Sequence, residues 1–272
     1  MFNHGGGRFV RRLSIEHMAS PAKRAEKPLR KVGFVGVCAG AGSTTLALAA
    51  AEWLAGAGAA ERRMAVTALE LSPASGARAG SPYDQLGCDR RFAGRGFASY
   101  YRLAKDGGPL PAQPQNLSGA VNWALRVPGE GGAHPGTAGL VRLLHTLPGD
   151  MVLCDVSAAL LAEGRDTARD ILSGLDRILC VVDPQPSRLL ASVRIMEDVR
   201  AAEARGVPVS YIVNKMSAGV NLRELTRFLA LKDPVFIPAL PAETIHAAEY
   251  GCRTLATEPA LAEAFTQLFQ PR

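Results

Sequence analysis

The sequence predicts an α/β protein built on a doubly wound, mainly parallel sheet with helices on both faces. Short runs rich in Val, Ile and Leu alternate with segments of helical pattern along most of the 272 residues, which is typical of buried parallel strands joined by helices. The first of these runs leads into a glycine-rich turn and then into a long alanine-rich helix. Because 47% of the residues are hydrophobic, the chain can bury a sizeable core.

Residues 1–30 carry basic side chains and glycines without sustained periodicity, so we expect a disordered basic arm followed by one domain at 31–272. Residues 1–31 hold eight Lys or Arg and two Glu, so the net charge of the whole chain, +6, resides there. The arm predicts non-specific contact with DNA or an acidic membrane surface; a solvated tail is an equal alternative. Met1 and Met18 are alternative start residues.

The first strand is expected at Lys31–Val37 and the first helix at Ser43–Ala55. Glycines between them allow the backbone to curl around an anion with no Cβ in the way, and the helix N-terminus directs N–H groups at it. We therefore expect this loop to bind phosphate groups. The expected phosphate-binding residues are Cys38, Ala39, Gly40, Ala41, Gly42, Ser43, Thr44 and Thr45.

The second strand is expected at Met64–Leu71, with Glu70 near its end and Ser72 just beyond it. Residues 74–119 are rich in Gly, Pro and Arg, and they predict an irregular insertion. Within it, Phe97–Leu103 predicts a short helix whose aromatic side chains we expect to pack on the sheet rather than to stack bases. A strand at Ala120–Val127, a loop at 128–136 and a helix at Thr137–Leu147 follow.

An apolar strand that ends in a carboxylate is expected at Met151–Asp155, and this form is typical of a strand whose aspartate holds magnesium through water. The alternation then continues to the end of the chain. The remaining expected elements are strands at Arg177–Val182, Val207–Val213 and Val235–Ile237, and helices at Ser187–Ala204, Asn221–Leu229, Ala242–Tyr250 and Pro259–Phe269.

The glycine-rich loop resembles the P-loop of the partition and septum-site ATPases, the ParA/MinD family of deviant Walker A P-loop NTPases, which reads Lys-Gly-Gly-x-Gly-Lys-Thr-Thr. Matching residue types stand at Gly40, Gly42, Thr44 and Thr45. Ala39 replaces a glycine, Cys38 replaces the signature lysine, and Ser43 replaces the lysine that reaches the β- and γ-phosphates. The chain therefore resembles a divergent member that lacks both P-loop lysines.

Three later segments also resemble the family, and together with the loop the matches cover roughly residues 31–255, apart from most of 74–135. They are Val181-Val182-Asp183-Pro184, Ile212-Val213-Asn214-Lys215 and Ile237-Pro238-Ala239-Leu240. The resemblance implies that Asn214 and Pro238 bind adenine, although Asn214 could also be a helix cap. It further implies that Thr44 and Asp155 flank Mg²⁺.

The resemblance also implies that Glu70 and Ser72 stand at the acidic positions of the family near magnesium and the attacking water. The first of these keeps a carboxylate and the second loses one. With both lysines replaced as well, we do not expect efficient hydrolysis, because catalysis of phosphoryl transfer is positioning and electrostatic stabilisation.

We therefore expect weak or degenerate binding of ATP and Mg²⁺, and a regulatory or scaffolding role in a bacterial positioning, partitioning or secretion-type system. The sequence suggests a cytoplasmic protein with an unidentified protein partner, and a homodimer is an open alternative. A second hypothesis is an active ATPase with a substitute cation from Arg78, Arg188 or Lys215. A third is a nucleic-acid-associated protein that acts through its basic arm.

A dehydrogenase of the short-chain class is a further, disfavoured alternative. Gly36, Gly40 and Gly42 have its glycine spacing, and Tyr101 with Lys105 has its Tyr-x-x-x-Lys spacing. That pair should lie far downstream of its position here. The histidines show no metal-ligand spacing, and the five cysteines show no CxxC spacing.

Overall fold

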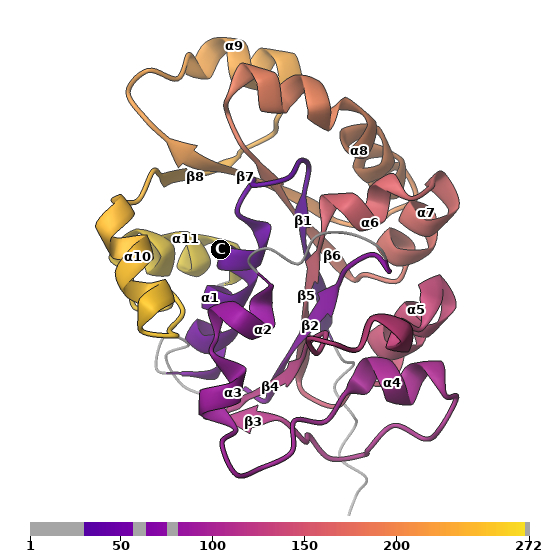
Figure 1. Cartoon of the computed structure of the whole chain (residues 1–272). Helices are drawn as coiled ribbons and strands as arrows, with labels where there is room; N and C mark the ends of the chain where they lie inside the picture. Colours follow the sequence, from indigo (N-terminus) through magenta and orange to yellow (C-terminus); the bar gives the residue numbers. More distant parts are fainter. Residues whose placement is uncertain (1–29, 57–63, 75–80, 270–272) are drawn as a thin grey trace, which may run out of the picture.

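The computed structural model describes residues 30–56, 64–74 and 81–269 (Figure 1). An eight-stranded sheet within these residues has the order β3-β4-β2-β5-β1-β6-β7-β8. All neighbouring strands pair in parallel except β3 and β4, which pair antiparallel. The strands are β1 (Arg30–Gly36), β2 (Val66–Leu71), β3 (Leu117–Ser118), β4 (Val121–Ala124), β5 (Met151–Val156), β6 (Arg177–Val182), β7 (Val209–Met216) and β8 (Val235–Pro238).

Helices cover both faces of the sheet, with α1, α10 and α11 on one side and α4 to α8 on the other (Figure 1). This arrangement confirms the predicted fold class. The helices are α1 (Ser43–Ala55), α2 (Pro82–Gln85), α3 (Cys88–Arg91), α4 (Tyr100–Lys105), α5 (Gly136–Thr146), α6 (Ala158–Ala162), α7 (Arg165–Ser173), α8 (Pro186–Ala204), α9 (Leu222–Leu229), α10 (Ala242–Tyr250) and α11 (Pro259–Phe269), with a 3₁₀ turn η1 (Gly131–Ala133).

The central strand β1 lies between β5 and β6, and its side chains are buried from both faces. Phe34 and Val35 are fully buried, as are Cys154 on β5, which pairs with Gly33, and Cys180 on β6, which pairs with Val35. Such continuous apolar strands are expected where helices cover both faces of a parallel sheet. Because these five strands run parallel, their carboxyl ends lie along one edge of the sheet, where the glycine-rich loop begins. The strands are β2, β5, β1, β6 and β7.

The segment at 81–119 is more regular than the sequence predicted, since α2, α3, α4 and β3 lie within it. The expected helix at Phe97–Leu103 begins three residues later, because the side chain of Ser99 caps it by accepting a hydrogen bond from the Arg102 N–H at 3.2 Å. Tyr100 and Tyr101 are almost fully buried, and their hydroxyls bond Asn122 on β4 and the Glu70 carbonyl on β2, so these two rings pack against the sheet as expected. Phe97 packs instead on Tyr83 and Phe92.

Two other elements differ from expectation. Residues 158–173 form α6 and α7, which the sequence did not predict because both are short and α7 is mostly polar, with only Ala168, Ile171 and Leu172 buried. The strand expected at Ala120–Val127 is shortened to β4. Of the expected arm, residues 1–29 lie outside the described part of the chain, so the division into arm and domain stays a prediction.

In the described residues, none of the helices has both the length and the apolar composition to cross a bilayer.

Candidate functional site

The glycine-rich loop, residues 38–45, joins the central strand β1 to α1. The Val37 N–H donates to the Val181 carbonyl at 3.1 Å, so the β1–β6 ladder continues to the start of the loop. Gly40 and Gly42 have φ angles of 77° and 91°, in the left-handed region that glycine adopts without strain. The loop therefore needs glycine at these two positions, as the sequence predicted.

Three consecutive carbonyls of the loop accept hydrogen bonds from side chains beyond β6. Arg188 Nη1 donates to the Ala39 oxygen at 2.6 Å, Lys215 Nζ to the Gly40 oxygen and Asn214 Nδ2 to the Ala41 oxygen at 2.9 Å. In a trans peptide, the C=O and the following N–H point in opposite directions. The N–H groups of Gly40 and Gly42, which follow the first and third of these carbonyls, therefore point away from the donors and can face an anion, whereas the Ala41 N–H donates to the Cys38 carbonyl at 3.2 Å.

Thr44 and Asp155 meet on the other side of the loop. Thr44 Oγ1 donates to Asp155 Oδ2 at 2.7 Å, while Asp155 Oδ1 is buried and has no hydrogen-bond partner in the described residues. A buried carboxylate oxygen without a partner is costly unless it binds an ion or water. The chemistry and placement of these oxygens fit Mg²⁺. Thr44 and Asp155 would coordinate the ion directly or hydrogen-bond to its coordinated water molecules.

Glu70 lies beside Asp155, because β2 and β5 pair these two residues directly. Burial raises the pKa of Asp155 to about 7, and the charge of Glu70 adds to the shift, whereas hydrogen bonds from Thr44 and Ser43 oppose it. Glu70 itself is held in place because its Oε2 accepts a hydrogen bond from the Arg126 N–H at 3.0 Å. Two carboxylates thus form the acidic side of the site.

Ser43 lies under the loop, since a Cβ added to Gly36 would approach Ser43 Oγ to 2.7 Å. Its short side chain is almost fully buried and lies close enough to Asp155 to lower the pKa of that carboxyl. Ser43 therefore contributes a hydroxyl to the acidic side of the site, where the family has a lysine.

The carbonyls of residues 70–74, at the end of β2 and just beyond it, bond side chains from the segment between β2 and α5. Tyr101 donates its hydroxyl to the Glu70 carbonyl at 2.8 Å, and His134 Nε2 lies 2.8 Å from the Ser72 carbonyl. The guanidinium of Arg126 donates to the Pro73 and Ala74 carbonyls, at 2.8 and 2.9 Å. Sequence reasoning missed these three supporting residues because no local pattern relates them to the loop.

The two expected adenine-binding residues lie on neighbouring strands. Pro238 ends β8, where it pairs with Met216 of β7, two residues beyond Asn214. The side chain of Asn214 packs on the glycine-rich loop, and a Cβ at Gly42 would come within 2.3 Å of its Nδ2. The structure thus places Asn214 against the loop and Pro238 on the edge strand β8, and their role toward adenine stays a prediction.

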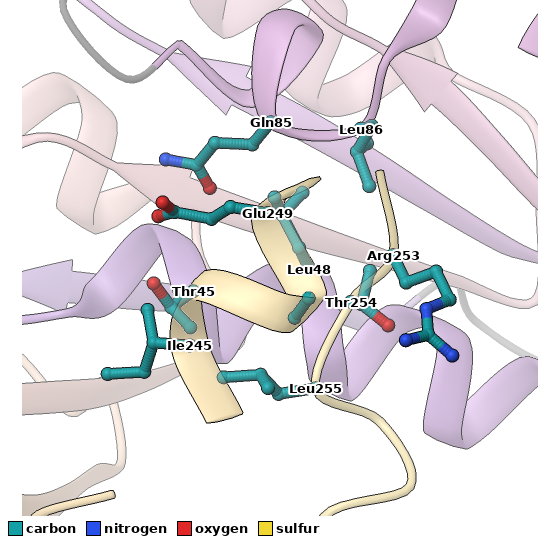
Figure 2. Close-up of a pocket in the computed structure, with 10 residues that line it drawn as sticks. Thr45, Leu48, Gln85, Leu86, Ile245, Glu249, Arg253, Thr254 and Leu255 are labelled. Atoms are coloured by element: carbon teal, nitrogen blue, oxygen red, sulfur yellow. The ribbon is translucent and has the colours of Figure 1, made fainter. Parts of the chain in front are cut away.

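A cleft lies next to the loop between α1, α2 and α10 (Figure 2). Its volume is about 30 Å³, enough for about two water molecules and too small for a nucleoside. The lining residues are Thr45, Leu48, Gln85, Leu86, Ile245, Ala248, Glu249, Arg253, Thr254 and Leu255.

Tyr101 and Lys105, which have the spacing of a dehydrogenase pair, bond to two different backbone carbonyls. Tyr101 is buried and bonded to the Glu70 carbonyl, whereas Lys105 is exposed and bonded to the Gly132 carbonyl. A glycine-rich loop between a central strand and a helix, with a threonine bonded to a strand-end aspartate, instead resembles the arrangement in P-loop sites.

Several solved structures are similar to this chain. A ParA family ATPase from Chlorobium tepidum TLS matches 89% of this chain and 97% of its own length, with a TM-score of 0.66 at 15% identity. The septum site-determining protein MinD from Pyrococcus horikoshii OT3, complexed with Mg-ADP, matches 89% of this chain and 94% of its own, with a TM-score of 0.66 at 17% identity.

A putative plasmid partition protein from Borrelia burgdorferi B31, bound to AMPPNP, matches 89% of this chain and 100% of its own, with a TM-score of 0.66 at 13% identity. No protein-family model and no curated protein matches the sequence. At these identities the likeness concerns the fold: the chain has the α/β fold of the ParA and MinD ATPases.

Proposed function

We propose that this protein is a ParA/MinD-like positioning or partitioning protein that binds a nucleotide and Mg²⁺ weakly and hydrolyses ATP slowly or not at all. The observation that carries the proposal is the geometry of the loop, with its carbonyls turned to one side and the Thr44–Asp155 pair on the other. Two proteins of similar fold, MinD with Mg-ADP and the partition protein with AMPPNP, support nucleotide as the ligand.

The weakness follows from the composition of the loop and α1. Residues 38–55 contain no Lys or Arg, so the cradle has only backbone N–H groups, hydroxyls and the positive end of the helix dipole. Removal of one group that stabilises transition-state charge typically slows a reaction by about 10²–10³-fold. Two missing cations are therefore compatible with binding but not with efficient hydrolysis.

On this basis the protein acts as a regulatory or scaffolding subunit in a bacterial positioning, partitioning or secretion-type system. Binding to a protein partner and formation of a homodimer are parts of this proposal. One observation favours a second candidate, an active ATPase: Arg188 and Lys215 both contact the loop, where either side chain could supply the missing charge.

Calorimetric titration with ATP and ADP, with and without Mg²⁺, tests the proposal when it is combined with phosphate release. Wild type is compared with Thr44→Ala, which removes the hydroxyl bonded to Asp155. Binding that needs Mg²⁺ and Thr44, with little phosphate release, supports the proposal. Fast phosphate release that Thr44→Ala abolishes favours the active ATPase. If neither nucleotide binds, nucleotide recognition is refuted and a scaffold remains.

A further inference from the structure

The two sides of the glycine-rich loop carry opposite charge. Glu70 and Asp155 lie on the β2–β5 side, whereas Arg188 and Lys215 reach the loop from the β6–β7 side. A magnesium–nucleotide complex is itself bipolar, since a cation is attached to a chain of anionic phosphates. It can lie across such a site with the metal toward the carboxylates and phosphate oxygens toward the basic side chains.

Arg188 lies over the first half of the loop. Its Nη1 donates to the Ala39 carbonyl at 2.6 Å, and both terminal nitrogens lie 3.6–3.7 Å from the point where a Cβ would stand on Gly40. Its charge also reaches the Cys38 thiol, whose pKa is raised by burial and by Asp183, while Arg188 and Lys215 oppose that rise. The bond to Ala39 therefore holds the guanidinium beside Gly40 and the first half of the loop.

Lys215 has a different environment. It is a non-glycine residue with φ of 60°, in the irregular part of β7, and its Nζ lies 3.2 Å from the buried carboxylate of Asp183 as well as on the Gly40 carbonyl. A lysine with these two partners braces the loop against β6 and β7. Arg188 is exposed near the start of α8, and its long side chain can turn from the carbonyl to an arriving anion.

We propose that Arg188 binds the terminal phosphate of a nucleoside triphosphate and so replaces, from α8, the cation that the loop lacks. This inference rests on the proposed function and names the residue that distinguishes tri- from diphosphate. Thr45, at the helix end of the loop, lines the cleft shown in Figure 2. Arg188 bonds the Ala39 carbonyl at the strand end of the loop. A phosphate chain that runs along the loop toward β1 would therefore end at the guanidinium, which can bond two phosphate oxygens at once.

The test measures dissociation constants of Mg-ATP and Mg-ADP for wild type, Arg188→Gln, Arg188→Lys and Arg194→Gln. Arg194 is the matched control, because it is an exposed arginine on the same helix that donates to the Ala162 carbonyl instead. Loss of a charge-assisted hydrogen bond predicts about 10- to 100-fold weaker Mg-ATP binding by Arg188→Gln, with Mg-ADP changed by less than about 3-fold. The dissociation constant of Mg-ATP for Arg188→Lys should lie between those for wild type and Arg188→Gln. Arg194→Gln should bind both nucleotides as wild type does.

Equal weakening of ATP and ADP by Arg188→Gln would show that the arginine only supports the loop, and it would overturn the inference. Wild-type affinity for Mg-ATP in Arg188→Gln would overturn it as well, while the proposed function would stand. Absence of Mg-ATP binding by wild type would refute both. Because Arg188 is exposed, thermal unfolding of each variant should match wild type, and Arg188→Lys retains a test if Arg188→Gln does not fold.

Discussion

Binding of Mg²⁺ with nucleotide should strengthen as the pH rises from 6 to 8, because of Asp155. Burial raises the pKa of this carboxyl to about 7, and Glu70 on the neighbouring strand adds to the shift. Magnesium binds the ionised carboxylate, so protonation competes with the metal. With a pKa of about 7, roughly 10% of Asp155 is ionised at pH 6 and roughly 90% at pH 8, which predicts about tenfold tighter binding.

The assay is a calorimetric titration with Mg-ATP at pH 6, 7 and 8 at constant ionic strength, with Asp155→Asn as the control. The phosphates of ATP also titrate, but they do so for both proteins, and only the tenfold change specific to wild type belongs to Asp155. A wild-type profile that is flat, or one that Asp155→Asn reproduces, would refute the reasoning from burial.

The same shift has a consequence for stability without metal or nucleotide. Since the pKa of Asp155 is higher in the folded than in the unfolded chain, the folded state binds more protons between about pH 4 and pH 7. The free energy of unfolding should therefore fall as the pH rises through this range and level off above it, by at most about 4 kcal/mol. Asp155→Asn should remove this slope in urea unfolding measured in EDTA.

Three further predictions concern other parts of the chain. Asn214→Ala should weaken ATP binding by about 1–3 kcal/mol; if tripolyphosphate binding weakens equally, the side chain braces the loop through the Ala41 carbonyl, and unchanged ATP affinity would contradict the adenine assignment. Ser43→Lys should strengthen Mg-ATP binding in the Arg188→Gln background, where it returns a cation to the cradle; in wild type, where the inference has Arg188 at the phosphates, the new lysine should meet a like charge and weaken binding. Deletion of residues 1–29 should reduce retention on DNA or anionic liposomes at low salt, and equal retention of both proteins would exclude a polyanion contact.

The sequence predicted the secondary-structure elements of this protein better than the contacts between them. The glycine-rich loop, Thr44 and Asp155 were readable because each follows a local rule: glycine at positive φ, a hydroxyl at a helix start and a carboxylate at a strand end. The short helices α6 and α7 were missed, because a few buried residues in a polar segment give too weak a periodicity.

The contacts around the loop were not readable in the same way. The bond from the Asn214 side chain to the Ala41 carbonyl was not expected, and its role toward adenine stays a prediction. Arg188 and Lys215 were only candidates for a missing charge. Arg188 is 149 residues from its partner in the loop and Lys215 is 175 residues from its own. Residues so far apart carry no shared local pattern.

By itself, the sequence determined the alternation of strands and helices, the loop that follows the first strand and the absence of Lys and Arg from that loop. These features depend on local backbone preferences and on which residues are apolar. Only the tertiary structure decided that carboxylates lie on one side of the loop and basic side chains on the other. The order β2-β5-β1-β6-β7 sets this, because it brings the carboxyl ends of distant strands to a single edge of the sheet.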